Sequence, residues 1–196
     1  MGQILRLISL TRRRFGEILK KNQCLESLHC SSFFDERGSL NTFRQDSRAK
    51  LPFSFVDCYI TKSPRGVVRG LHLQLSDEIP LKYVKPTDGS IVLIALCLDP
   101  NHEAYRTVSQ FPVNSQERIA VVIQPMHAIG YLVQSEYAEV FVASSVSYQA
   151  DREIGVNVLT LKEISILIEG CILSEKDQNL PSLQEVLIQL NSGRFE

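Results

Sequence analysis

The segment 69–74, which reads RGLHLQ, gathers the residues whose types and spacing suit acid–base chemistry. A predicted strand over 66–73 carries it, and because strand side chains alternate between two faces, His72 and Gln74 share one face. Lys82 follows on the next predicted strand. Inside a barrel, the imidazole of His72, the ammonium of Lys82 and the guanidinium of Arg69 would surround one anionic ligand. A single histidine on an apolar strand is more often a core residue, so both interpretations stand at this point.

The elements that must position these residues are mostly strands. From residue 53 onward, short β-rich runs alternate with turn sequences such as SPRG at 63–66 and PTDG at 86–89. This pattern predicts an all-β sandwich or barrel. Pro181 and Ser182 precede apolar residues at helical spacing, which predicts a short closing helix over 182–190. The predicted strands are 53–61, 66–73, 81–85, 90–98, 104–108, 119–123, 130–134 and 138–145.

Length and composition predict a single domain. The chain has 196 residues, of which 44% are hydrophobic, and this is enough for one substantial core. We expect residues 31–196 to form that domain, with residues 1–30 as a basic lead-in that contacts another subunit. Lysine and arginine together number 21 against 22 acidic residues, so no overall positive field attracts nucleic acid or an anionic membrane.

The cysteines and the N-terminal segment bear on the compartment. Five cysteines are widely spaced, and the absence of a CxxC pair argues against a zinc site or a redox couple. The apolar run at 4–10 is interrupted by Arg6 and falls far short of the ~20 residues needed to span a bilayer. No small-residue cleavage site follows it. We therefore expect a cytoplasmic protein with no signal peptide and no membrane span.

Several motifs, in order along the chain, resemble one known family. They are FDERG at 34–38, RGLHLQ at 69–74 followed by Lys82, IQP at 123–125, GYLV at 130–133 and LSEKD at 173–177. In this order and spacing they resemble the dTDP-4-dehydrorhamnose 3,5-epimerases and related sugar-nucleotide cupins. The resemblance runs from about residue 33 to residue 183. It implies a cupin fold, which is a double-stranded β-helix (jelly-roll) barrel, here with short flanking helices.

The resemblance also implies a substrate and a chemistry. Members of this family are expected to be homodimers that bind a nucleotide-diphospho-4-keto-6-deoxy sugar and use neither a metal nor an organic cofactor. A 4-keto group acidifies the hydrogens on carbons 3 and 5, so that a base can remove a proton and an acid can return it on the opposite face. The products would serve deoxysugar or surface polysaccharide biosynthesis.

The family's site residues are carried over by position. His72 would be the base, held by the carboxylate of Asp177, and Lys82 would stabilise the enolate oxygen. Arg37 and Arg69 would grip phosphate or ketosugar oxygens, because a guanidinium offers a fork of donors. The remaining substrate-binding candidates are Gln74 of the signature, His127 near the pocket, and Tyr148 beside the position of an aromatic residue that stacks on the base.

The sequence departs from the family at several positions. The family's catalytic tyrosine falls on Val142, which has no proton to donate, and its second histidine falls on Ile129. Tyr59 replaces an asparagine near the ligand, and Ser147 stands where the stacking aromatic is usual. An epimerase acting at one carbon, or a ketoisomerase, therefore fits the surviving residues better than a double epimerase. Tyr137 or Tyr148 would supply the missing hydroxyl only after a register shift or a bent loop.

Two other interpretations use the same residues. One is a weakened or inactive cupin paralogue that binds sugar nucleotides or serves assembly. The other is a metal-binding cupin, because Gly66, His72, Gln74 and Glu78 approximate the first cupin metal motif with glutamine in place of one histidine. The histidine of the second metal motif falls on Gly130.

Overall fold

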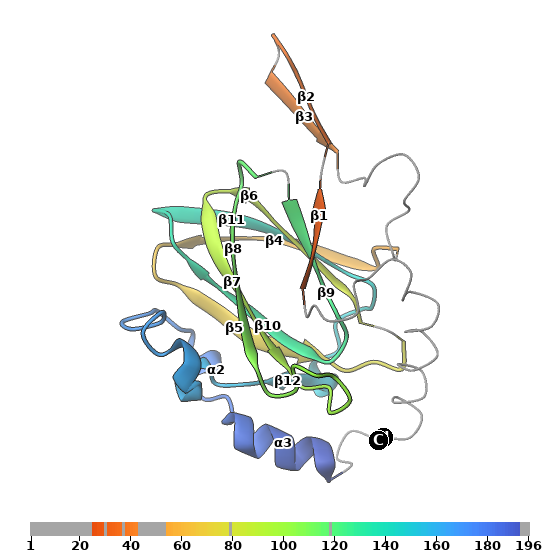
Figure 1. Ribbon diagram of the computed structural model, residues 1–196, viewed down its shortest axis with the longest axis vertical. Coiled ribbons are helices and arrows are strands. Elements are labelled where there is room, and N and C mark those ends of the chain that lie inside the picture. The colour runs from red at the N-terminus through yellow and green to blue at the C-terminus, as the bar shows by residue number, and fades with distance from the viewer. Residues whose placement is uncertain are drawn as a thin grey trace.

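The computed structural model describes residues 25–29, 31–36, 38–42, 54–78, 80–117 and 119–192. Two five-stranded antiparallel sheets face each other across an apolar interior (Figure 1). The first sheet runs in the order β1 (Leu25–His29), β9 (Ile119–Ile123), β6 (Lys82–Asp88), β11 (Tyr137–Ser144) and β4 (Asp57–Pro64). The second runs in the order β12 (Glu153–Gly155), β5 (Val68–Gln74), β10 (His127–Val133), β7 (Ser90–Cys97) and β8 (Val108–Asn114). A separate hairpin pairs β2 (Ser31–Asp35) with β3 (Gly38–Thr42). The predicted all-β jelly-roll barrel is confirmed.

Strand alternation builds the interior between the sheets. Val140 and Val142 of β11 point inward and meet Leu93 of β7 and Ile129 and Tyr131 of β10 in one buried cluster. The intervening residues of β11 point to the other side, where Phe141 packs against Tyr83. A residue's parity along its strand therefore decides whether it faces the interior.

The outer face of the second sheet is buried as well. Ile94 and Leu96 of β7 pack there with Val186 and Leu187 of α3 (Leu183–Asn191). This double burial explains the continuous apolar run IVLIALC at 91–97, which is typical of a strand covered on both faces. The apolar sequence of β7 therefore indicates a strand that is buried on both faces.

The helices are short, and α2 and α3 lie on the side of the second sheet (Figure 1). A capping box begins α3, since Ser182 accepts from the Glu185 backbone N–H while the Glu185 carboxylate accepts from the Ser182 backbone N–H. The predicted helix over 182–190 is thereby confirmed. The other helical elements are the α-helix α2 (Glu175–Gln178) and the 3₁₀ helices η1 (Ala150–Arg152), η2 (Val158–Thr160) and η3 (Lys162–Ile164). Among the described residues, no helix has the length and apolar character needed to cross a membrane.

Strand prediction succeeded and failed for identifiable reasons. The predicted strand 119–123 coincides with β9, whereas the predicted strand 104–108 is wrong. Consecutive turns occupy that segment, with the Tyr105 N–H donating to the His102 carbonyl and Arg106 in the left-handed region at φ 67°. The strand β1 falls inside the predicted lead-in 1–30 and pairs with β9, while residues 1–24 lie outside the described residues.

A bulge in β5 matters for function. His72 pairs with Ile129 and Arg69 pairs with Tyr131, so the register shifts by one residue between these two pairs. Two glycines permit β5 and β10 to approach closely at the bulge. A Cβ at Gly70 would lie 2.5 Å from the Ile129 carbonyl oxygen, and a Cβ at Gly130 would lie 2.3 Å from the Arg69 carbonyl oxygen. In a regular strand, residues three apart face opposite sides. The bulge instead turns Arg69 to the same interior face as His72.

Candidate active site

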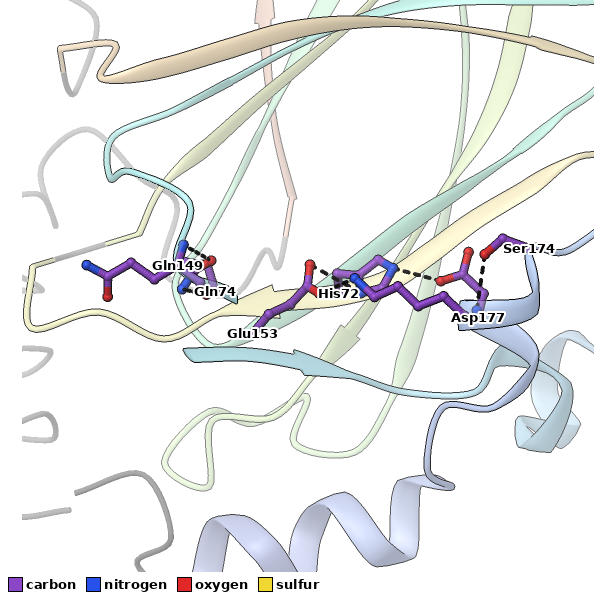
Figure 2. Close-up of polar contacts among 7 residues, drawn as sticks. His72, Gln74, Gln149, Glu153, Ser174 and Asp177 are labelled. Carbon is purple, nitrogen blue, oxygen red and sulfur yellow. Dashed lines mark hydrogen bonds and ion pairs between the residues drawn. The ribbon is translucent and has the colours of Figure 1, made fainter. Parts of the chain in front are cut away.

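His72 lies between two carboxylates on the inner side of the second sheet. Its Nε2 is 2.8 Å from Oδ1 of Asp177, and its Nδ1 is 3.5 Å from Oε1 of Glu153 (Figure 2). The His72 side chain keeps 22% of its surface exposed and that of Asp177 only 8%, but Nδ1 of His72 is itself buried behind Glu153 and makes no hydrogen bond. An ionised carboxylate only accepts hydrogen bonds, so Nε2 donates to Asp177, and the neutral form of the imidazole then has its lone pair on Nδ1.

Local structure holds Asp177 in place. The residue lies in α2, whose N-cap Ser174 accepts a hydrogen bond from the Asp177 backbone N–H at 3.1 Å. This cap fixes the first turn of a helix of only four residues. The chain thus brings together two residues that are 105 positions apart in sequence.

Glu153 links His72 to Lys176. Its other oxygen, Oε2, forms an ion pair with Nζ of Lys176, the neighbour of Asp177 on α2. The hydrogen bond to Glu153 raises the pKa of Lys176 above its usual value. Glu153 comes from β12, where it pairs with Gln74 of β5. A three-residue strand therefore adds the second carboxylate.

Lys82 faces the same interior from the first sheet. It begins β6 and pairs with Ile123, whose side chain belongs to the interior cluster. Burial lowers the pKa of Lys82 below its usual value, and the nearby Glu153 carboxylate opposes this shift. An ammonium in this position is suited to stabilise negative charge that develops on a bound ligand.

Arg69 reaches across the barrel to the first sheet. Its Nε donates to the hydroxyl of Ser63 at 2.8 Å, and Ser63 is buried on the inner face of β4. This bond orients the guanidinium and leaves its Nη groups to bind oxygens of a ligand. The sequence singled out Arg69, but only the bulge explains why it shares the interior with His72.

The other sequence-predicted residues have varied positions. The Gln74 amide nitrogen donates to the carbonyls of Leu75 and Gln149 at 3.1 Å, and its oxygen accepts from the Gln149 N–H, so Gln74 ties β5 to the segment before β12 (Figure 2). Tyr148 is 56% exposed and acts electrostatically on Lys176. Arg37 lies outside the described residues. The ligand-binding roles of these three residues stay predictions.

His127 is buried at the start of β10. Its Nδ1 donates to the Pro125 carbonyl at 2.8 Å, and its ring packs edge-on against His102 with centroids 5.6 Å apart. Its parity matches that of Ile129, which faces the interior. None of its hydrogen bonds involves His72 or the residues bound to His72, and its role in ligand binding also stays a prediction.

The structure removes one candidate proton donor. Tyr137 pairs with Pro64 in an uninterrupted β11–β4 register, and its parity is opposite to that of Val140 and Val142. Its ring lies under the ammonium of Lys62, at 4.6 Å from the centroid. The hypothesis that a shifted register brings Tyr137 into the site is therefore wrong.

Sequence analysis named Tyr59 but missed the row of polar residues on β4 to which it belongs. Asp57, Tyr59, Thr61 and Ser63 occur at every second position and so share the inner face. Thr61 and Tyr131 join their hydroxyls across the interior at 2.5 Å. The alternation in the sequence would have revealed this row, whereas nothing in the local pattern around Glu153 predicts a strand there.

The residues of the cupin metal motif do not gather. Glu78 is exposed in the loop after β5, and the position of the second motif's histidine is Gly130 within β10. Across the described ranges, no group of three or more His, Cys, Asp or Glu side chains is placed to hold a metal ion.

Comparison with known proteins decides the family. A family model described as dTDP-4-dehydrorhamnose 3,5-epimerase matches residues 25–185, most of the chain. The chain belongs to the dTDP-4-dehydrorhamnose 3,5-epimerase family. The dTDP-4-dehydrorhamnose 3,5-epimerase of Escherichia coli is 27% identical over 164 residues, which cover 79% of this chain and 87% of that protein.

Solved structures agree on the fold. An epimerase from Legionella pneumophila in complex with dTDP-4-keto-L-rhamnose superimposes with a TM-score of 0.74 at 22% identity, covering 87% of this chain and 94% of that one. A 3'-monoepimerase from Streptomyces bikiniensis, in complex with dTDP-quinovose, gives a TM-score of 0.74 at 19% identity and covers 90% and 98%. The predicted cupin barrel of this epimerase family is therefore confirmed.

Proposed function

We propose that this chain epimerises carbon 3 or carbon 5 of a nucleotide-linked 4-keto-6-deoxy sugar. The observation that carries the proposal is the His72–Asp177 hydrogen bond of 2.8 Å, which orients an imidazole toward an interior that also contains Lys82 and Arg69. Family membership and the solved complexes with dTDP-sugars support the substrate class.

The chemistry follows from the positions of the side chains. Nδ1 of His72 removes the proton next to the ketone, and the C–H electron pair becomes an enolate whose oxygen lies near the Lys82 ammonium. Asp177 stabilises the imidazolium through Nε2. Access to Nδ1 requires the Glu153 carboxylate to move aside, toward Lys176, which already holds its other oxygen. Arg69 binds phosphate or sugar oxygens.

The predicted assembly and location belong to the same proposal. A homodimer is supported by the edge position of β4, where Ile60 is an exposed apolar side chain on the outward face and Val56, also exposed, precedes the strand. A cytoplasmic location is supported by the free thiols of Cys58 and Cys171, because disulfides form in oxidising compartments.

Deuterium exchange tests the function directly. We expect incubation with a dTDP- or CDP-linked 4-keto-6-deoxy sugar in heavy water to place deuterium on carbon 3 or carbon 5, as read by mass and proton NMR. His72→Asn should abolish the label. Glu78→Gln is the matched control, because this exposed carboxylate belongs only to the metal interpretation, and it should exchange like the wild type.

Two results would contradict the proposal. Binding of the nucleotide sugar without exchange at any carbon would identify a noncatalytic binding protein. Loss of exchange in Glu78→Gln, with stoichiometric metal in the wild type, would favour the metal cupin.

A further inference from the structure

Inversion of a carbon needs an acid on the face opposite the base. His72 reaches the ligand space from β5 of the second sheet, so a proton returned to the other face must come from the first sheet. On β11, which lies between β6 and β4, Val142 points inward and is 4% exposed within the apolar cluster. That residue has no proton to give.

Tyr59 is the direct cross-strand partner of Val142. The two residues pair in the β4–β11 register, and directly opposed residues of an antiparallel pair project from the same face. The next inward residues of β4 confirm the direction of this face, since Thr61 bonds Tyr131 and Ser63 bonds Arg69, both on the second sheet. Tyr59 is therefore on the wall that faces His72.

The environment of Tyr59 suits a proton donor. Its side chain is 51% exposed, so solvent can reprotonate it, and within the described part of the chain its hydroxyl makes no hydrogen bond. Partial burial of the side chain raises the pKa of Tyr59, the charges of Tyr131, Asp57 and Glu153 add to the rise, and Arg69 opposes it. The phenol is thus neutral at physiological pH and lies within electrostatic reach of two site residues.

The other tyrosines near the interior are less suited. The Tyr131 hydroxyl is engaged with Thr61, and its ring is almost fully buried in the cluster. Tyr148 acts on Lys176, which pairs with Glu153 on the same side as His72. Only Tyr59 combines an unengaged hydroxyl with the opposite wall.

We propose that Tyr59 is the catalytic acid that returns the proton, supplied by β4 across from the valine at position 142. This inference rests on the proposed epimerase function. The enolate carbon takes the proton of the Tyr59 hydroxyl, the C=O bond re-forms, and the resulting phenolate regains a proton from water. His72 releases the abstracted proton to water, so protons and charge balance over the cycle.

Tyr59→Phe in heavy water tests this role. Without the phenol, His72 still removes the proton and returns a deuteron from solvent to the same face. We expect deuterium to enter the substrate with retained configuration, while inverted product forms about 100-fold more slowly, the lower range for loss of a general acid. The matched control is Tyr137→Phe, which removes a phenol hydroxyl from the neighbouring strand β11 on its outward face and should invert like the wild type.

Each outcome decides the question. Wild-type rates of inversion in Tyr59→Phe would overturn the proposal, as would equal loss of exchange and inversion in a variant whose thermal unfolding matches that of the wild type. A wild-type protein that neither exchanges nor inverts any such sugar would instead overturn the proposed function itself, and the two failures are therefore distinguishable.

Discussion

The two walls of the barrel interior differ in how they prepare a proton transfer. On the second sheet, His72 lies between Asp177 and Glu153, and Lys176 continues the chain of charges. On the first sheet, the uncharged residues Val142, Tyr59 and Thr61 face His72, while the charged Asp57 and Lys82 lie at the starts of β4 and β6. A base that becomes a cation benefits from fixed anions, whereas an acid that must stay protonated benefits from a site without cations bound to it. The asymmetry therefore matches abstraction on one wall and return on the other.

Asp177→Asn should give the largest effect on the charged wall. An amide cannot stabilise the imidazolium and favours the wrong tautomer of His72, so we expect kcat to fall about 10,000-fold, the loss seen when a catalytic histidine has its orienting carboxylate replaced by an amide. Glu153→Gln is the comparison, because Glu153 is 3.5 Å from Nδ1 and should cost less. Steady-state rates of inversion measure both. Equal losses would mean that the two carboxylates share one role.

Substitutions of Lys82 test whether the first sheet supplies the positive charge that stabilises the enolate. Lys82→Met should lower kcat about 100-fold, the loss expected when one donor to a developing oxyanion is removed. Lys82→Arg keeps the charge. Because the pKa of Lys82 is lowered, its ammonium is lost at a lower pH than that of a free lysine, so wild-type activity falls as pH rises through that pKa. In Lys82→Arg the fall should move to higher pH, and an unmoved alkaline limb would exclude this role.

Ser63→Ala tests the side-chain hydrogen bond by which the first sheet orients Arg69 of the second sheet. Without the hydroxyl, Arg69 loses the acceptor of its Nε, so we expect KM for the sugar nucleotide to rise about threefold to tenfold with kcat unchanged, consistent with ~1 kcal/mol for one hydrogen bond. Inhibition by free dTDP separates loss of phosphate contact from loss of sugar contact. A fall in kcat at constant KM would contradict a binding role.

The smallest expected effect on kcat comes from removing the N-cap of α2, and the N-cap of α3 provides the comparison. Ser174→Ala and Ser182→Ala each remove an N-cap, and each should lower the free energy of unfolding by about 1 kcal/mol. Only α2 carries Asp177, so only Ser174→Ala should also lower kcat, by a few-fold. Thermal unfolding and turnover measured on both variants make the comparison. If Ser182→Ala lowered kcat equally, α3 would support the site as well as the sheet.

The fold was predictable because its signals are local. Turn sequences, apolar alternation and the capping pattern at 182–185 predicted the all-β barrel and its closing helix. The strand prediction for 104–108 was wrong because the apolar residues there lie in consecutive turns. These turns follow Asp99, whose carboxylate accepts from the Asn101 N–H. The short strand β12 was not predicted, because three residues are too few to show the alternation of apolar and polar side chains that marks a strand.

The sequence by itself determined the family, since ordered motifs from FDERG to LSEKD survive across the chain, and it singled out His72, Lys82 and Asp177. Tertiary structure alone decided the rest. The bulge at Gly70 turned Arg69 inward, β12 brought Glu153 to Nδ1 of His72, and the β4–β11 register set Tyr59 against Val142. These placements depend on strand register between distant segments, and a shift of one residue would reverse every side chain.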